Sequence, residues 1–159
     1  MQIDATDRRL LELLQSDASV SNQELAELAH TSPATALRRV RRLVDAGVIE
    51  RRVALLNPDR LGSGLTALVE ITLDRQGAEH LDAFEQRAVA DDQVQQCWRV
   101  SPGPDFVLVV QAGDMPGYHV LVQRLFTQDA NVRNVKAFFS VKRAKFEPRI
   151  ALPAADRRA

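Results

Sequence analysis

The pattern of apolar and polar positions divides the chain into a helical first third and a mixed α/β remainder. Up to about residue 50, apolar residues recur at spacings of three and four, as in amphipathic helices. Beyond residue 64, segments that alternate with a period of two are interspersed with helical patterns, which predicts strands and helices in one sheet-containing domain.

The first predicted helix spans residues 4–16. Its apolar side chains, expected beneath the rest of the first domain, are Ile3, Leu10, Leu11 and Leu14. Charges on the outer face of a first helix are usually solvated, so we expect the neighbouring charged residues to contact water only. These residues are Asp7, Arg8 and Arg9.

Residues 21–47 predict two short helices joined by a tight polar turn. Ser21 lies three residues before Glu24, the spacing of a capping box. Ser32 then precedes Pro33 at a second helix start, and Gly47 lies where a left-handed C-terminal residue is expected. With the first helix, this arrangement predicts a minimal three-helix DNA-binding head built on a helix-turn-helix.

The second helix of this pair is rich in arginine. Its apolar stripe, expected to face the core, is Leu37, Val40 and Val44. An arginine fork can grip a phosphate or pair with a guanine edge in the major groove. The residues predicted to enter the groove are Thr35, Arg38, Arg39 and Arg42, and those predicted to hold phosphates are Ser32, Arg41 and Arg51. The alternative is a merely solvated charged face.

The charge distribution supports DNA contact in spite of a formal net charge of zero. Between residues 30 and 60, seven arginines face only Asp45, Glu50 and Asp59, an excess of four positive charges. A locally basic helix on a neutral body predicts salt-sensitive, moderate binding by each head. More than one head is therefore expected on the DNA.

The composition is ordinary for a globular chain of 159 residues, with 26% charged and 45% apolar residues. No apolar run approaches the roughly 20 residues that span a bilayer, and the N-terminus is amphipathic where a signal peptide would be apolar. The single cysteine, Cys97, cannot form an internal disulfide and is expected as a buried strand thiol. We therefore expect a cytoplasmic protein with no membrane partner.

A linker is predicted between the two domains. Residues 48–56 read as a β segment, and Asn57, Pro58 and Asp59 with two nearby glycines mark a break. The expected organisation is a head at 1–50, a linker with a β segment at 51–63, a second domain at 64–150 and a flexible tail at 151–159.

The second domain is predicted to have the order βαββαβ. The expected strands are 65–73, 94–100, 106–112 and 132–141, and the expected helices are 77–90 and 115–128. This order predicts an α+β, ferredoxin-like domain with two helices on one face of an antiparallel sheet. Apolar runs at 106–110 and 138–139 would leave the other face wet, so we expect a second copy to cover it. A linker or tail folding over that face is the alternative.

Five segments carry a resemblance to a known family: IDATDRRLLELLQSDA, ELAELAHTSPATALRRVRRLVDAGVI, ALLNPDRLG, LVEITL and QCWRVSPGPDFVLVV. Together they resemble the Lrp/AsnC family, the "feast or famine" regulators of bacteria and archaea. The resemblance implies a winged or wingless helix-turn-helix head and a βαββαβ domain for amino-acid sensing and dimerisation. It also implies homodimers that often assemble into octamers.

The family's effector site lies near a turn written V-S-G-x-x-D, at contacts between dimers. Here Val100, Ser101 and Asp105 match, and Asp105 is expected to meet a ligand's ammonium group. Pro102 replaces the usual glycine and removes a backbone donor. Val135 and Ala137 stand where many members carry threonines. The candidate effector residues are Ser101, Gly103, Asp105, Val135 and Ala137.

These departures leave alternatives open. The effector is either different and more apolar, or this member has lost its effector response. Asp105 would otherwise be a turn carboxylate that caps local amides. A non-responsive architectural DNA compactor is a second reading of the whole chain.

An enzyme resembling the sirohaem decarboxylases is a third reading. His30, His80 and His119 show no metal-ligand spacing, and no nucleophile with a neighbouring base is visible. Trp98 with Arg99 is the sole pair suited to a tetrapyrrole. We therefore expect no catalytic residue, no metal and no cofactor.

Overall fold

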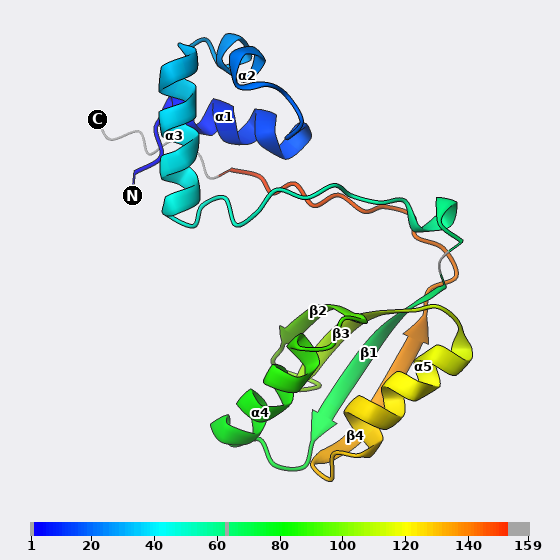
Figure 1. The fold of residues 1–159 in the computed structure, drawn as a ribbon. Coiled ribbons are helices and arrows are strands. Elements are labelled where there is room, and N and C mark those ends of the chain that lie inside the picture. Colours follow the sequence, from blue (N-terminus) through cyan, green and yellow to red (C-terminus); the bar gives the residue numbers. More distant parts are fainter. Residues whose placement is uncertain (1, 63, 153–159) are drawn as a thin grey trace. The chain divides into compact units, whose positions relative to one another are not determined.

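A computed structural model describes residues 2–62 and 64–152 and arranges them in two compact units. The first unit contains the chain up to residue 55 together with the segment from residue 145 onward. The second unit contains residues 56–144. Each unit has its own core and is described by itself (Figure 1).

Three helices build the first unit: α1 (Ala5–Ser16), α2 (Asn22–Leu28) and α3 (Pro33–Asp45). Each begins at a side-chain cap. Ser21 Oγ accepts a hydrogen bond from Glu24 N, and Ser32 Oγ accepts one from Thr35 N, both at 3.2 Å. The sequence prediction missed a complete capping box at Asp4, whose carboxylate accepts from backbone amides of the first turn and whose own amide donates to Asp7 Oδ2. The predicted helices are confirmed within a residue or two at each end.

The helices of the predicted pair end in the same way. At the end of α3, Gly47 has a φ of 69°, and Val48 N donates to Leu43 O at 2.9 Å. At the end of α2, His30 has a φ of 54°, and Thr31 N donates to Ala26 O at 2.9 Å. Both ends are Schellman motifs, which satisfy the last carbonyl groups of the helix. The histidine therefore takes the position that glycine usually occupies.

The core of the first unit corrects the predicted phase of α3. Its buried residues are Leu10, Leu25, Ala26, Ala29, Ala36 and Val40. Leu37 and Val44, predicted to face this core, are 42% and 45% exposed. The stripe of Ala36, Val40 and Leu43 is buried instead. Alanines on α2 and α3 let the two helices approach closely, and this advantage outweighs the greater hydrophobicity of leucine at the neighbouring position.

The predicted β segment at 48–56 is wrong. Residues 50–57 have no regular secondary structure, and a short 3₁₀ helix, η1 (Pro58–Arg60), follows them. A strand requires a hydrogen-bonded partner strand, and the described residues provide none for this segment. The apolar residues of the segment, including Val53, Leu55 and Leu56, are exposed.

The second unit confirms the predicted βαββαβ order. Its elements are β1 (Leu65–Leu73), α4 (Ala78–Val89), β2 (Val94–Arg99), β3 (Phe106–Ala112), α5 (Met115–Val122), a π-helical extension η2 (Gln123–Thr127) and β4 (Val132–Phe139). The strands form one antiparallel sheet in the order β2-β3-β1-β4. This is the predicted α+β, ferredoxin-like layer.

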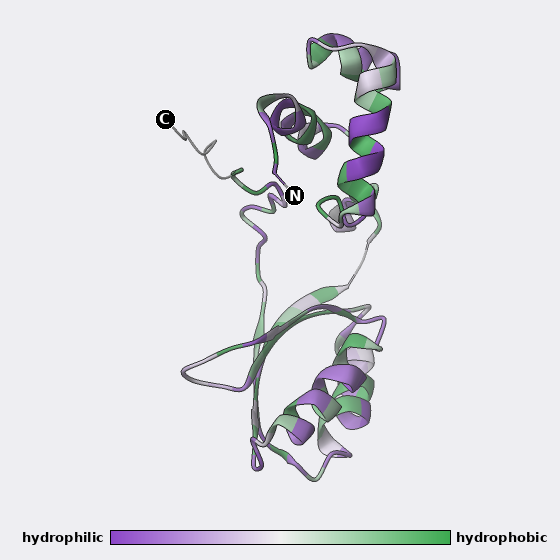
Figure 2. Ribbon diagram, turned by 90° about the vertical axis from the view of Figure 1, so that its left-hand side faces the viewer, coloured by the Kyte–Doolittle hydropathy of each residue, from purple (hydrophilic) through white to green (hydrophobic). Residues whose placement is uncertain are grey.

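Both helices of the second unit cover one face of this sheet (Figures 1 and 2). The alternate residues of β1 and β3 that point toward the helices are buried, and Phe84 of α4 packs on Phe106 with ring centroids 4.8 Å apart. Cys97 on β2 is half-buried, and burial raises the pKa of its thiol.

The other face of the sheet carries apolar side chains that neither helix of the second unit covers. In the strand register, Leu68 of β1 lies opposite both Val109 and Phe138, and Trp98 lies opposite Val107. Leu68, Trp98 and Phe138 are about half exposed. We call these five residues the open apolar row. A continuous row of this kind marks an interaction surface.

The C-terminal segment of the described chain lies against α1. Ile150 N donates to Gln15 Oε1 at 2.8 Å, and Gln15 Nε2 donates to Ile150 O at 3.2 Å. Arg149 Nη1 donates to Ser16 Oγ at 3.3 Å. Residues 145–152 thus belong to the same compact unit as the head. The sequence pattern instead predicts that residues up to 150 belong to the second domain. Residues 153–159 of the predicted flexible tail lie outside the described residues.

Candidate DNA interface and effector site

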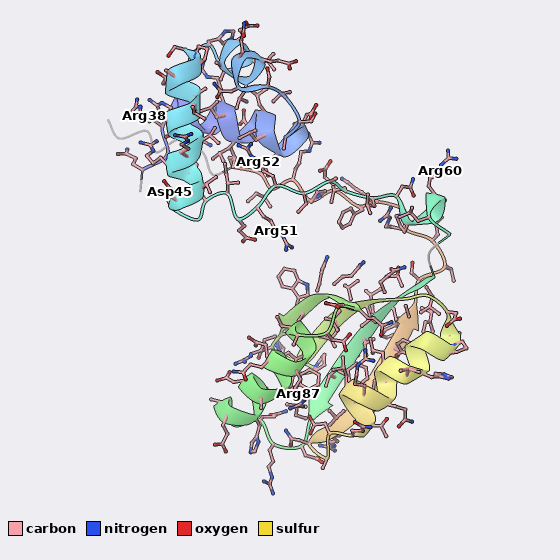
Figure 3. The ribbon with its side chains drawn as sticks, in the orientation of Figure 1. Arg38, Asp45, Arg51, Arg52, Arg60 and Arg87 are labelled. Carbon is pink, nitrogen blue, oxygen red and sulfur yellow. The ribbon has the colours of Figure 1, made fainter. Side chains whose placement is uncertain are left out.

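The side of α3 opposite the core forms the candidate DNA interface. Its exposed residues are Ala34, Leu37, Arg38, Arg41 and Asp45, which with Arg42 line a shallow depression. Arg38 and Asp45 project from α3 on the side away from α2 (Figure 3). We call the five exposed residues the outer face of α3. Positions 34, 38, 41 and 45 are spaced by four, three and four, so the correct helical phase would have identified this face from the sequence.

Asp7 of α1 holds two of the predicted DNA-contacting arginines. Arg39 Nη1 donates to Asp7 Oδ1 at 3.0 Å and to Asp4 Oδ2 at 2.6 Å. Arg42 Nη2 donates to Asp7 Oδ2 at 2.5 Å. The Asp7 side chain is fully buried, which corrects the expectation that it contacts only water. Arg39 and Arg42 of α3 pair with the Asp7 carboxylate in the interior, because a buried carboxylate needs charged hydrogen-bond donors as partners.

The same contacts correct the predicted role of Arg39. Its side chain is only 20% exposed and lies against α1, not on the outer face of α3. Its Nε atom is buried and makes no hydrogen bond to any described residue. Arg42 lies on the border, since one nitrogen binds Asp7 while its side chain is 47% exposed. Arg39 therefore joins α3 to α1 in this structure.

The ion pair of Asp4 with Arg39 persists at neutral pH. A hydrogen bond from the Asp7 amide lowers the pKa of the Asp4 carboxyl, and the Arg39 guanidinium lowers this pKa further. In return Asp4, followed by Asp7, raises the pKa of Arg39. Asp4 and Arg39 are therefore both charged at neutral pH.

Three other predicted DNA-contacting arginines remain available. Arg38, Arg41 and Arg51 are exposed and have no hydrogen-bond or ion-pair partner among residues 2–62 and 64–152. Arg38 and Arg41 both lie on α3. Figure 3 shows Arg38 on this helix and Arg51 after its end. The hydroxyls of Ser32 and Thr35 are hydrogen-bonded to each other at 2.9 Å within the cap of α3.

The predicted effector turn joins β2 to β3. Asp105 Oδ2 accepts hydrogen bonds from Leu73 N at 2.7 Å and from Gln76 Nε2 at 3.3 Å. Gly103 has a φ of 124°, a conformation that side chains disfavour, and the Ser101–Pro102 peptide bond is cis. One carboxylate oxygen of Asp105 thus caps the end of β1, 32 residues away in the sequence, whereas the alternative predicted that it would cap amides of its own turn.

The other two effector candidates lie on β4. Val135 and Ala137 are half-buried on the helix side of the sheet and pack against its core. Within the register, Ile71 of β1 lies between Val135 and Phe106, so two strand spacings, about 10 Å, separate β4 from the start of β3. The fold brings the two groups of candidates to the same end of the sheet without direct contact.

Metal chemistry and membrane insertion find no support in the described part of the chain. No group of three or more His, Cys, Asp or Glu residues there is arranged to hold a metal ion. Among the same residues, no helix is both long and apolar enough to cross a membrane. Arg99, the candidate tetrapyrrole contact, pairs with Asp82 and Glu85, each at 2.7 Å.

Both units match known protein families. Residues 3–50 match a winged helix-turn-helix DNA-binding family, and residues 66–150 match the Lrp/AsnC ligand binding domain. The chain belongs to the Lrp/AsnC family. As a member, it is a DNA-binding transcriptional regulator with a ligand-binding second domain, which confirms the resemblance carried by the sequence motifs.

Curated relatives agree over nearly the whole chain. A leucine-responsive regulatory protein of Rhizobium meliloti is 35% identical over 145 residues, covering 91% of this chain and 93% of that protein. The DNA-binding transcriptional activator DecR of Escherichia coli K12 is 33% identical over 144 residues, covering 91% and 95%. The relatives are thus named as regulators.

Solved structures share the fold. An AsnC family transcriptional regulator from Agrobacterium tumefaciens superposes with a TM-score of 0.85 at 28% identity, covering 93% of this chain and 96% of that one. A transcriptional regulator from Neisseria meningitidis in complex with L-methionine gives 0.85 at 26% identity, covering 94% and 97%. The α+β architecture of this family member is therefore that of its solved relatives.

Proposed function

We propose that this family member binds its DNA sites through the outer face of α3. The observation that carries the proposal is the pair Arg38 and Arg41, exposed together on that helix with no partner among the described residues. Both guanidinium groups are therefore available to a ligand, and an arginine fork matches phosphates and guanine edges. A helix of this size fits the major groove.

The arginines divide into three roles. Arg38, at the centre of the outer face, reads a base edge. Arg41 and Arg51 hold phosphates on either side, aided by the exposed start of α3 at Ser32 and Thr35. Arg39 stays paired with Asp7 of α1 and fixes the angle of α3. The exposed part of Arg42 contributes at the edge of the interface.

A symmetric homodimer supplies two heads for two half-sites. The open apolar row of the second unit supports it, because a second copy of the same sheet face would remove those side chains from water. Two heads bind with the avidity that a single weakly basic head lacks. Higher assemblies of dimers would then bring effector turns together.

The proposed effector is an amino acid with an apolar side chain. Val135 and Ala137 offer apolar surface near the end of the sheet. Asp105 keeps Oδ1 without a described partner and could accept a ligand's ammonium group there. Solved relatives from Neisseria meningitidis and Mycobacterium tuberculosis contain L-methionine, which supports this class of ligand.

The proposed function is that of a regulator and not of an enzyme, and we place it in the cytoplasm. Curated relatives named as regulators support this view. A ligand-induced change in the packing of dimers would shift which DNA geometry is favoured.

Fluorescence anisotropy with a duplex from upstream of the protein's own gene tests the proposal. A scrambled duplex is the reference, at two salt concentrations and with or without L-methionine. We expect a preference of about a thousandfold for the native duplex. Arg38→Ala should relax preference at particular base pairs, and Arg51→Ala should weaken all sequences alike and flatten the salt dependence.

Arg75→Ala, at an exposed arginine of the second unit, is the matched control and should bind DNA normally. Equal affinity for both duplexes would favour the DNA compactor. Absence of binding to either at low salt would exclude the DNA-reading role altogether. Titration by L-methionine that leaves the binding curve unchanged would remove methionine as the effector.

A further inference from the structure

Leu37 is an exposed leucine. It lies on the outer face of α3, where its side chain is 42% exposed, although leucine is usually buried. The core of the first unit does not include it, because Ala36, Val40 and Leu43 form the buried stripe of the helix. The exposed part of the Leu37 side chain is therefore available to a ligand of the outer face.

The surroundings of Leu37 are those of a nucleic-acid surface. It shares one shallow depression with Ala34, Arg38 and Arg41. Both arginines lack partners among the described residues. An apolar protein partner would have to bury these two guanidinium groups without compensation, which is costly, whereas DNA phosphates and base edges pair with them directly. Charge complementarity thus favours DNA as the occupant.

The position along the helix is also informative. Leu37 and Ala34 lie in the first two turns of α3, which begins at Pro33. In a helix-turn-helix, the N-terminal residues of the recognition helix contact base edges in the major groove. Among the four bases, only thymine presents a methyl group there, and apolar side chains contact it.

We propose that Leu37, supported by Ala34, contacts the C5-methyl group of a thymine in each half-site. Leu37 is then a specificity-determining residue that adds to the arginine contacts, and the inference rests on the proposed DNA-reading function. An arginine fork can distinguish guanine, but it cannot sense the thymine methyl. The outer face of α3 therefore recognises two chemical features of the site.

Removal of single methyl groups from the DNA tests this contact. Each thymine of the preferred duplex is replaced in turn by 2′-deoxyuridine, which keeps every hydrogen-bonding group and lacks only the methyl. We expect wild-type affinity to fall about fourfold at one position in each half-site, the effect of exposing one methyl-sized apolar group. The Leu37→Ala variant loses the contact in both half-sites, so it should bind the thymine duplex about sixteenfold more weakly and should show no further loss at that position.

Control variants separate this contact from the rest of the interface. Val44→Ala changes a similarly exposed apolar residue in the last turn of α3 and should keep the full response to deoxyuridine. Leu37→Gln keeps the length of the side chain and should lose the response as Leu37→Ala does. Circular dichroism establishes that each variant is folded.

The outcomes distinguish the inference from the proposed function. If wild-type protein prefers the native duplex but tolerates every deoxyuridine, or if Leu37→Ala still responds to the substitution, the methyl contact is wrong and the arginine interface stands. If wild-type protein shows no preference for the native duplex, the proposed function is overturned and the methyl contact with it.

Discussion

His30 adopts, at the end of α2, the left-handed backbone conformation that Gly47 adopts at the end of α3. The two positions make the same Schellman hydrogen bonds. A residue with a Cβ atom is disfavoured in this conformation by roughly 1–2 kcal/mol, whereas glycine is not. Local strain is therefore present in the turn of the helix-turn-helix, and no tertiary contact of His30 is needed to account for it.

We expect His30→Gly to be more stable than His30→Ala by about 1 kcal/mol, since both remove the exposed imidazole and only glycine relieves the backbone. Urea unfolding of the full chain measures the difference. Gly47→Ala is the matched control and should lose a similar amount, because its added Cβ would meet no atom within 4 Å. Equal stability of the two His30 variants would contradict the backbone explanation.

Asp4 makes the first unit sensitive to acid. Its pKa is lowered in the folded state by the Asp7 amide and then by Arg39, whereas the unfolded value is about 3.9. The contribution to stability is therefore complete above the unfolded pKa and is lost as the pH falls through the lower, folded pKa. Asp4→Asn keeps an oxygen that can cap α1 but removes this titration.

We expect the thermal midpoint of the wild type to fall more steeply below about pH 4 than that of Asp4→Asn. Thermal unfolding followed by circular dichroism between pH 2 and pH 6 measures this difference. Asp92→Asn, at an exposed carboxylate of the second unit, should follow the wild type. Parallel curves for wild type and Asp4→Asn would show that Asp4 has no such role.

At the scale of the elements, α1 and α3 are joined through one buried carboxylate. Asp7 receives hydrogen bonds from Arg39 and Arg42, which lie 32 and 35 residues away in the sequence. The two arginines thereby neutralise a fully buried charge and hold α3 against α1. This orientation determines which residues of α3 form its outer face.

We expect Asp7→Asn to lower the free energy of unfolding by about 2 kcal/mol, because hydrogen bonds to charged groups are lost while the arginines stay partly buried. Denaturant unfolding measures the loss. Glu12→Gln, on the exposed side of the same helix, should change stability by less than about 0.5 kcal/mol. If Asp7→Asn left the free energy of unfolding unchanged, hydrogen bonds from the arginines to water would fully replace those to Asp7.

At the scale of the whole molecule, the proposed function depends on bringing two heads together. The open apolar row belongs to the second unit, where Leu68 lies at its centre between Val109 and Phe138. A charged side chain there would be buried without a partner in a face-to-face dimer. Stability of the single unit would change little, because Leu68 is half exposed within it.

We therefore expect Leu68→Arg to shift the protein to monomers in sedimentation equilibrium while circular dichroism stays unchanged. Its affinity for a two-half-site duplex should fall by about a hundredfold as avidity is lost. Val120→Arg, at an exposed position on α5, is the control for added charge. An unchanged oligomer in Leu68→Arg would place the interface elsewhere.

Local chemistry explains why the fold was predictable. Ser21, Ser32, Pro33 and Gly47 mark helix boundaries through hydrogen bonds and φ preferences within a few residues, and each marks the element observed. The alternation of apolar and polar residues along β1 is also a local pattern, and it predicts the bounds of that strand. The segment at 48–56 failed because its strand-like composition depends on a partner strand, which is a non-local requirement.

The sequence by itself determined the order of the elements, the family and the identity of the DNA-binding helix. Only the tertiary structure decided which arginines of that helix stay free. Arg38 and Arg39 are neighbours with the same chemistry, but close packing of alanines sets the rotation of α3 and turns Arg39 toward Asp4 and Asp7. Rotation about a helix axis depends on residues far apart in the chain, and no local pattern specifies it.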